Sequence, residues 1–280
     1  MSETNTANPE MAELWNGPGA RSWITAQALL DQAFRGFETL LATMAADAGA
    51  RAVLDVGCGT GATTRAIASR IAPEGTAVGL DLSAPMIAHA ERLAETENSP
   101  ARFLAGDAQT HAFPPDGFDL IVSRFGVMFF SDPVAAFQNL RRAAKPGAGL
   151  AMISWRSISE NPFMTVAERA AAPLLPDLPQ RTGGGSGQFA FADEDYVHGI
   201  LNDAGWTGAA SEKLDMVCAF PAAALDTYLS LMGPVGQILA KSDEATRERV
   251  LSAIRAGFEE YIAGPDIQFT GACWLTRANA

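Results

Sequence analysis

The chain has 280 residues, and its 32 acidic residues against 20 basic ones give a formal net charge of -12. Hydrophobic residues make up 48% and charged residues 19%, which is typical of a folded globular protein and excludes a disordered one. Because an acidic surface repels polyanions, we do not expect nucleic acid as a partner. The length is sufficient for one large α/β domain with insertions, or for a core with a small cap.

The cysteines and the N-terminal segment indicate the cellular compartment in which the protein is expected. The three cysteines, Cys58, Cys218 and Cys273, are odd in number and widely spaced, so they predict neither a disulfide framework nor a metal site. Residues 1–17 lack the apolar region of a signal peptide, and no stretch reaches the roughly 18 apolar residues of a membrane span. We expect a cytoplasmic protein without a membrane span, and the sequence is compatible with a monomer or a homodimer.

The first predicted element is a helix that begins near Trp23, because its apolar residues recur at spacings of three and four. Strands and helices then alternate as far as Trp155. The strands are predicted at 51–57, 76–80, 101–104, 118–123 and 149–155, with helices at 62–71, around Met86 to Leu93, and at 134–144. This alternation is typical of a mostly parallel sheet with helices on both faces.

After Trp155 the pattern changes. A helix is predicted at 162–172, and the glycine-rich residues 181–188 are interpreted as a flexible connector without chemistry. Two strands, at 213–220 and 271–278, enclose two further helices, whose apolar residues are Leu225, Tyr228, Leu229 and Met232, and Val250, Ile254, Phe258 and Tyr261. We expect these helices to cover the carboxyl edge of the sheet, where open α/β sheets bind ligands.

The predicted fold is therefore α/β, with a doubly wound, mostly parallel, seven-stranded Rossmann-like sheet and a helical cap inserted near the C-terminus. Three parts are expected: an arm with a lid helix at 1–48, a cofactor-binding core at 49–156, and the remaining strands with a substrate cap at 157–280.

Glycines at 57, 59 and 61 follow the first strand and open a helix. Glycine permits a close approach of the backbone, and the start of a helix offers unpaired N–H groups to a polar ligand. The pattern indicates a nucleotide-type site, and on spacing alone it also fits a dinucleotide oxidoreductase. Asp81, at the end of the second strand, suits ribose hydroxyls in both interpretations.

The segments around the glycine loop distinguish a dinucleotide oxidoreductase from another kind of nucleotide-type site. Together they resemble the class I S-adenosylmethionine-dependent methyltransferases, near the ubiquinone and menaquinone biosynthesis group, over roughly residues 50–155. The matching segments are VLDVGCGTG, VGLDLSAPMIAHA, FLAGDAQ, FDLIVSRFGVMFF with the following Asp132-Pro133, and LRRAAKPGAGLAM. Ala148 departs from the pattern, because the family usually has a second glycine there.

The resemblance implies the roles of the residues around the glycine loop. Asp55 and the loop backbone, from Gly57 through Cys58 and Gly59 to Gly61, should face the methionine and sulfonium part of S-adenosylmethionine. Asp81 should accept hydrogen bonds from the two ribose hydroxyls.

Further along the chain, Leu82 and Met86 should enclose the adenine, and Asp107 should accept from its amino group while the Ala108 backbone addresses the ring. The pair Arg124-Phe125 should line the methionine end.

Trp15, in the arm, is a candidate lid residue over the cofactor, and a tryptophan that only packs the arm is the alternative. His111 is the candidate for a general base, and no catalytic residue is otherwise identified.

The resemblance thus implies transfer of a methyl group to a small-molecule acceptor with an oxygen, nitrogen or carbon nucleophile, and S-adenosyl-L-homocysteine as the product. The acidic surface favours a neutral or cationic, partly apolar acceptor, with expected walls at Phe129, Phe130, Trp155, Phe163 and Trp274. Two alternatives are a cofactor-binding protein that does not methylate and an NAD-dependent oxidoreductase.

Overall fold

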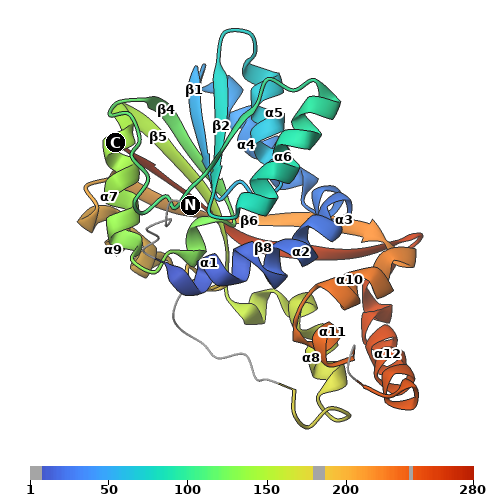
Figure 1. The fold of residues 1–280 in the computed structure, drawn as a ribbon. Coiled ribbons are helices and arrows are strands. Elements are labelled where there is room, and N and C mark those ends of the chain that lie inside the picture. Colours follow the sequence, from blue (N-terminus) through green and yellow to red (C-terminus); the bar gives the residue numbers. More distant parts are fainter. Residues whose placement is uncertain (1–7, 179–186, 240–241) are drawn as a thin grey trace.

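The structure is a computed structural model that describes residues 8–178, 187–239 and 242–280 (Figure 1). Its strands form one sheet in the order β3-β2-β1-β4-β5-β8-β6, and β7 pairs with β8 beside this path. The strands are β1 (Ala52–Val56), β2 (Thr76–Asp81), β3 (Arg102–Ala105), β4 (Phe118–Arg124), β5 (Ala144–Trp155), β6 (Thr207–Pro221), β7 (Ile262–Ala263) and β8 (Asp266–Asn279). The first five strands are parallel to one another, and β8 is antiparallel to β5 and β6.

Helices cover both faces of the sheet, with α4, α5 and α6 on one side and α7 and α9 on the other (Figure 1). The helices up to the fifth strand are α1 (Pro9–Asn16), α2 (Pro18–Thr25), α3 (Gln27–Ala33), α4 (Arg35–Asp47), α5 (Ala62–Ile71), α6 (Ala84–Glu97) and α7 (Pro133–Ala143). Those beyond it are α8 (Val166–Ala171), α9 (Glu194–Asp203), α10 (Leu225–Leu231), α11 (Pro234–Leu239) and α12 (Glu244–Phe258). The predicted α/β fold with a mostly parallel, seven-stranded sheet is confirmed, and the short β7 is added to it.

The strand order places the site. β1 lies between β2 and β4, so the chain runs outward from β1 in one direction and then returns to its other side. Such a reversal opens a crevice at the carboxyl ends of the strands, where ligands bind. The loop of residues 57–61 leaves β1 at this point.

The leading helix, predicted to begin near Trp23, is divided into α2, α3 and α4, with a first break at Ala26 and a second at Phe34. The rings of Phe34 and Phe37 both pack against Phe125 and Trp155, so the apolar face continues through the second break. The apolar spacing therefore persists across that break and does not reveal it.

β5 begins at Ala144 rather than at the predicted residue 149. Its partner β4 pairs Phe118 with Ala144 and Leu120 with Gly149, so residues 145–148 form an irregularity within the strand. α7 ends at Ala143, before the Pro146-Gly147 pair as the sequence indicates, and β5 begins at the next residue, so no loop separates the helix from the strand.

The predicted helix at 162–172 is a 3-10 turn, Pro162–Thr165, followed by the short α8. Of the glycine-rich segment, residues 181–186 lie outside the described residues.

Three helices, α10, α11 and α12, lie between β6 and β8, where two were predicted. α11 and α12 pack with α8, which follows β5 in the chain, and α10 packs with α11. Figure 1 shows the four helices together at one end of the molecule. One cluster of buried apolar residues extends from α3 and α4 through the sheet to α12. Among the described helices, none combines the length and the apolar character needed to span a membrane.

Candidate functional site

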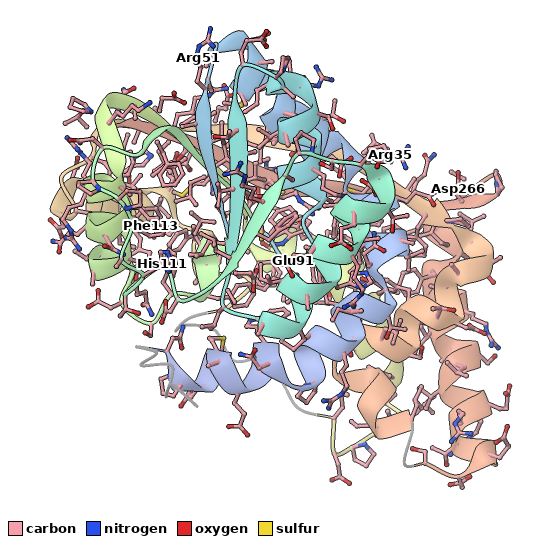
Figure 2. The ribbon with its side chains drawn as sticks, turned by 45° about the horizontal axis from the view of Figure 1, so that its top comes forward. Arg35, Arg51, Glu91, His111, Phe113 and Asp266 are labelled. Carbon is pink, nitrogen blue, oxygen red and sulfur yellow. The ribbon has the colours of Figure 1, made fainter. Side chains whose placement is uncertain are left out.

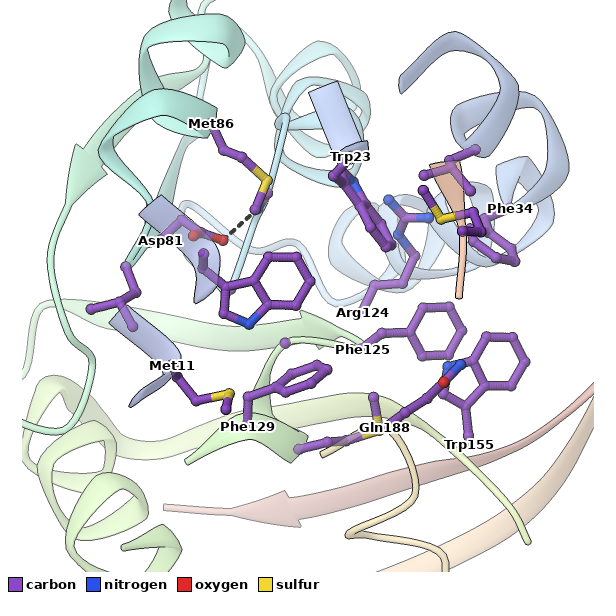
Figure 3. Close-up of a pocket in the computed structure, with 18 of the residues that line it drawn as sticks. Met11, Trp23, Phe34, Asp81, Met86, Arg124, Phe125, Phe129, Trp155 and Gln188 are labelled. Atoms are coloured by element: carbon purple, nitrogen blue, oxygen red, sulfur yellow. Dashed lines mark hydrogen bonds between the residues drawn. The ribbon is translucent and has the colours of Figure 1, made fainter. Parts of the chain in front are cut away.

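A cavity of about 520 Å³ lies at the carboxyl ends of the strands, within the size range of small-molecule sites (Figure 3). Its walls come from three parts of the chain, which we name the arm, the core side and the cap side. The arm supplies Asn8, Met11, Trp15 and Trp23. The core side is formed by lining residues between Leu30 and Trp155, and the cap side by Phe163, Met164, Ala167, Glu168, Gln188, Tyr228, Leu229, Met232, Gly233, Val235 and Phe258.

The glycine loop approaches the cavity with its backbone. Gly57 has φ +68°, and a Cβ on it would lie 2.5 Å from the Cα of Gly126, so no side chain fits between these two loops. Gly59 also lines the cavity, and its N–H donates to Oδ2 of Asp81 at 2.7 Å. Gly61 does not line it; a Cβ there would meet the ring of Phe103 in β3 at 2.6 Å and the Cβ of Ala90 in α6 at 3.0 Å, so a side chain at this position would clash with both elements.

Asp81 ends β2 with its carboxylate at the cavity wall. Oδ1 accepts from the backbone N–H of Ser83 at 2.8 Å and Oδ2 from that of Gly59. Burial raises the pKa of this carboxyl, and the two backbone hydrogen bonds lower it in opposition. Each oxygen keeps acceptor capacity, so the carboxylate can receive two adjacent hydroxyl groups.

The residues expected around adenine also line the cavity: Leu82, Met86, Asp107 and Ala108. Met86 lies in the first turn of α6, where its N–H donates to the side chain of Ser83 at 3.3 Å. Asp107 accepts from the backbone N–H of Gln109 at 2.9 Å, which fixes its carboxylate at the turn after β3. Met86 and Asp81 face the cavity from the same side in Figure 3.

Asp55 and Cys58 lie behind the lining. Asp55 is 1% exposed, and its Oδ2 accepts from the Thr64 hydroxyl at 2.6 Å. Burial raises the pKa of Asp55 to about 6, against the opposing hydrogen bond from Thr64. In the part of the chain that the structure describes, its Oδ1 has no hydrogen-bond partner. Burial also raises the pKa of the Cys58 thiol, which disfavours the thiolate needed for a nucleophile.

Arg124 and Phe125, at the end of β4, both line the cavity. The Nε of Arg124 donates to the Thr63 hydroxyl at 3.0 Å, and its guanidinium lies 5.8 Å from the ring centre of Phe34. Phe125 has φ +64°, a backbone conformation that is costly for a bulky residue. Its ring is stacked on Trp155, with centroids 4.2 Å apart and planes 5° apart, and this contact holds the strained residue in place.

The arm closes the cavity beside the predicted adenine site. Asn16 ties it to the start of α6, since its Oδ1 accepts from the N–H of Ala84 at 3.0 Å and its Nδ2 donates to the carbonyl of Leu82 at 3.3 Å. The ring of Trp15 meets Phe129 edge to face at 5.4 Å. Trp15 thus packs against Phe129 and lines the cavity, and its role as a lid over the cofactor stays a prediction.

The cap side brings aromatic rings to the opposite wall. Phe163, Tyr228 and Phe258 line the cavity, and Glu168 of α8 adds a carboxylate among them. Of these residues, the sequence predicted only Phe163 as a wall of the site. Tyr228 and Phe258 were identified only as apolar residues of predicted helices. Nothing in the sequence indicated that Glu168 or Gln188 would line the cavity.

Besides Asp55, Cys58 and Gly61, two further predicted residues lie outside the lining. His111 follows β3 beside Phe113, with ring centroids 4.7 Å apart (Figure 2), and burial lowers its pKa. The Nε1 of Trp274 donates to the carbonyl of Ala192 at 2.9 Å, and Trp274 is not among the residues that line the cavity. The base role of His111 stays a prediction, without a contact to the cavity in its support.

The core side fits S-adenosylmethionine on its own chemistry. The close pair of Gly57 and Gly126 leaves backbone against the cavity, Asp81 offers acceptors for a ribose, and apolar Leu82 and Met86 form a slot for a flat ring. The buried, unpartnered Oδ1 of Asp55 lies one residue before Val56, which lines the cavity floor. Such a carboxylate favours a ligand with a positive charge nearby.

Comparison with known proteins also points to S-adenosylmethionine-dependent methyltransferases. Residues 53–147 match a family described as a methyltransferase domain. The demethylmenaquinone methyltransferase of Roseiflexus castenholzii is 34% identical over 187 residues, which cover 62% of this chain and 75% of that protein. The demethylmenaquinone methyltransferase of Thermus thermophilus is 32% identical over 142 residues, covering 51% of this chain and 64% of that protein, so over a third of that protein is unmatched.

The fold is also found among solved structures. A candidate methyltransferase from Bacillus halodurans superposes with a TM-score of 0.55 at 18% identity, covering 86% of this chain and 97% of that one. At this identity the likeness concerns the fold, and the family follows from the sequence relatives. The chain belongs to the class I S-adenosylmethionine-dependent methyltransferases.

Proposed function

We propose that this protein transfers the methyl group of S-adenosylmethionine to a small, partly apolar acceptor bound against the cap side. The observation that carries the proposal is that one continuous cavity has a core side with the carboxylates of Asp81 and Asp107 and a largely apolar, aromatic cap side. A cofactor and an acceptor can therefore meet in one pocket, and methyl transfer requires the two to be held together.

The bound cofactor supplies a methyl group on a positively charged sulfur, which an acceptor lone pair attacks in line while the electrons of the broken bond stay on sulfur. The glycine-loop backbone and Asp81 would hold the cofactor, with the Asp81 carboxylate itself fixed by the N–H groups of Gly59 and Ser83. The strained Phe125, stacked on Trp155, forms a rigid wall between the core and cap sides. Rigid walls act by aligning the two reactants.

Water exclusion is the second contribution of the chain. The arm covers the cavity through Trp15 and the hydrogen bonds of Asn16, while helices of the insertion close the other side. We propose that residues 157–280 act as the substrate cap in this sense. Enclosure protects the reactants from hydrolysis and strengthens the electrostatic contacts inside the site.

The test is methyl transfer to a panel of acceptors. The purified protein is incubated with S-adenosylmethionine labelled at the methyl group and with aryl-alkyl amines, phenols and quinols, and both labelled product and S-adenosylhomocysteine are quantified. Equal amounts of the two products, formed only with an acceptor, support the proposal. Tight cofactor binding without transfer to any compound class would favour a protein that binds the cofactor and does not methylate.

A further inference from the structure

A buried arginine, Arg65, lies behind the glycine loop. It belongs to α5, close to the start of the helix, and is 7% exposed, although arginine is rarely buried in proteins. It is not among the residues that line the cavity. Burial of a guanidinium is costly unless hydrogen bonds and opposite charges compensate it, so the contacts of Arg65 show what this position stabilises.

One of these contacts reaches the loop itself. The Nη1 of Arg65 donates to the carbonyl of Thr60 at 2.7 Å, and Thr60 is 2% exposed. The backbone N–H of the same arginine donates to the carbonyl of Gly61 at 2.9 Å. Arg65 therefore holds two successive carbonyls of the loop, one through its side chain and one through its main chain.

Two carboxylates orient the guanidinium toward Thr60. Its Nε donates to Oε2 of Glu97, the last residue of α6, at 2.8 Å. Its Nη2 lies 3.6 Å from Oδ2 of Asp31 in α3, next to Leu30, which lines the cavity. The fixed fork of a guanidinium suits such a set of partners, and the two carboxylates balance its buried charge. The loop is thereby connected to α3 and α6 from behind.

The loop has a further fixed point on the cavity side, where the N–H of Gly59 donates to Asp81 at 2.7 Å. Three of the five residues 57–61 are glycines, so ordering this loop has a large entropic cost. Hydrogen bonds on both sides of the loop meet that cost before a ligand arrives, and such preorganisation increases affinity.

We propose that Arg65 is a positioning residue, which holds the glycine loop in the conformation that receives the methionine end of the cofactor. This inference rests on the proposed function, since it assigns a role in binding S-adenosylmethionine at the same cavity. Arg65 acts through the carbonyl of Thr60 and does not touch the ligand. Its loss should therefore weaken ligands that reach the loop, and should spare ligands that occupy only the adenine and ribose sites.

The test compares two ligands that share adenine and ribose. S-adenosylhomocysteine carries the amino-acid end, and 5′-deoxy-5′-methylthioadenosine lacks it. Calorimetric titrations with both are made on the wild-type protein and on Arg65→Met, and hydrogen exchange of residues 57–61 is measured without ligand by mass spectrometry. Thermal unfolding verifies that each variant is folded at the temperature of the titrations.

Two control variants separate the loop contact from the other contributions. Arg156 is also a buried arginine, with hydrogen bonds to Glu160, to Asp215 and to the carbonyl of Cys273, and it lies outside the lining. Arg156→Met therefore removes a comparable set of contacts away from the loop. Glu97→Gln removes only the charge of a partner whose side chain is 49% exposed, and such an ion pair contributes little.

Arg65→Met should bind S-adenosylhomocysteine at least about tenfold more weakly than the wild type, as expected for the loss of a hydrogen bond from a charged donor. Its affinity for methylthioadenosine should change by less than about threefold, and residues 57–61 should exchange faster. Both control variants should stay within about twofold of the wild type for both ligands. If Arg65→Met does not fold, Arg65→Lys replaces it, and the same pattern with a smaller loss is expected.

Three results would overturn the inference: unchanged binding of S-adenosylhomocysteine in a folded Arg65 variant, an equal loss for both ligands, or an equally large loss in Arg156→Met. Failure of the wild type to bind S-adenosylhomocysteine would contradict the proposed function instead. Hydrogen exchange would then still decide whether Arg65 orders the loop, because that measurement uses no ligand.

Discussion

The core side and the cap side of the cavity are built in different ways. On the core side, main-chain geometry sets the shape: Gly57 against Gly126, and backbone N–H groups of Gly59 and Ser83 on Asp81. On the cap side, side chains from short helices set it, through stacked rings such as Phe163 on Phe269. A backbone-built wall suits a constant cofactor, whereas a wall built from side chains can be altered residue by residue to suit an acceptor.

Gly57→Ala should produce the largest change on the core side. The new methyl group would meet the Cα of Gly126 at 2.5 Å with φ held at +68°, so strain and overlap should lower the free energy of unfolding by about 4 kcal/mol and abolish measurable cofactor binding. Denaturant unfolding and calorimetry measure the two effects.

Gly147→Ala is the matched control for this variant. Gly147 has φ +79° with no atom within 4 Å of a Cβ, so its substitution carries the backbone strain alone. A loss of about 1 kcal/mol with intact cofactor binding is expected. Equal losses in the two variants would show that close approach of the loops is not what matters.

The pH dependence of stability should reveal the buried Asp55. Its pKa is raised from 3.8 to about 6 in the folded protein, so the folded state holds this proton more tightly than the unfolded state. The stabilisation is therefore present below pH 4 and is lost as the pH rises through 6, with a magnitude of about 3 kcal/mol.

Asp55→Asn removes this titration and can still accept from Thr64. The difference in unfolding free energy between wild type and variant, measured by urea at pH 4, 5, 6 and 7, should change in favour of the variant as the pH rises. A difference that stays constant across that range would mean that the carboxyl titrates normally.

Asp81→Ala should weaken cofactor binding by about 2 kcal/mol, because the ribose hydroxyls lose charge-assisted hydrogen bonds. The comparison on the cap side is Tyr228→Phe, which should leave cofactor affinity within about twofold, since the ring and its stacking on Phe220 remain. Calorimetry with S-adenosylhomocysteine measures both. If the two variants bind it equally well, the assignment of the two sides is wrong.

Trp15→Ala should weaken cofactor binding less than Asp81→Ala does, by about 1 kcal/mol, through lost apolar contact in the arm. Its signature is a faster dissociation of S-adenosylhomocysteine in stopped-flow measurements. A loss of thermal stability with unchanged dissociation would instead assign Trp15 to packing alone.

The difference between the two sides also explains what the sequence could predict. The strands, the glycine loop and Asp81 follow from local signals, because glycine spacing and strand ends specify main-chain geometry. Those signals did not tell which residues point into the cavity: Asp55, Cys58 and Gly61 were expected at the cofactor and lie behind the lining. Whether a side chain points into the cavity is decided by the alternation of side chains along β1 and by the position at which α5 begins. Both depend on the register of β1 within the sheet.

The cap side was less accessible to sequence analysis. Helical periodicity predicted two insertion helices, but α11 is only six residues long, too short for a periodic signal. Glu168 lines the cavity because α8 packs against α12, which lies about 80 positions away in sequence. No local pattern records such a contact, so a polar residue in a short helix is indistinguishable from a solvent-exposed one before the fold is known.

The most direct test of the central claim is calorimetric titration of the wild-type protein with S-adenosylhomocysteine and NAD in parallel. The structure and its relatives predict binding of S-adenosylhomocysteine at one site per chain with micromolar or better affinity, and no binding of NAD. Binding of NAD without S-adenosylhomocysteine would contradict the account, because the core side would then be built for a dinucleotide.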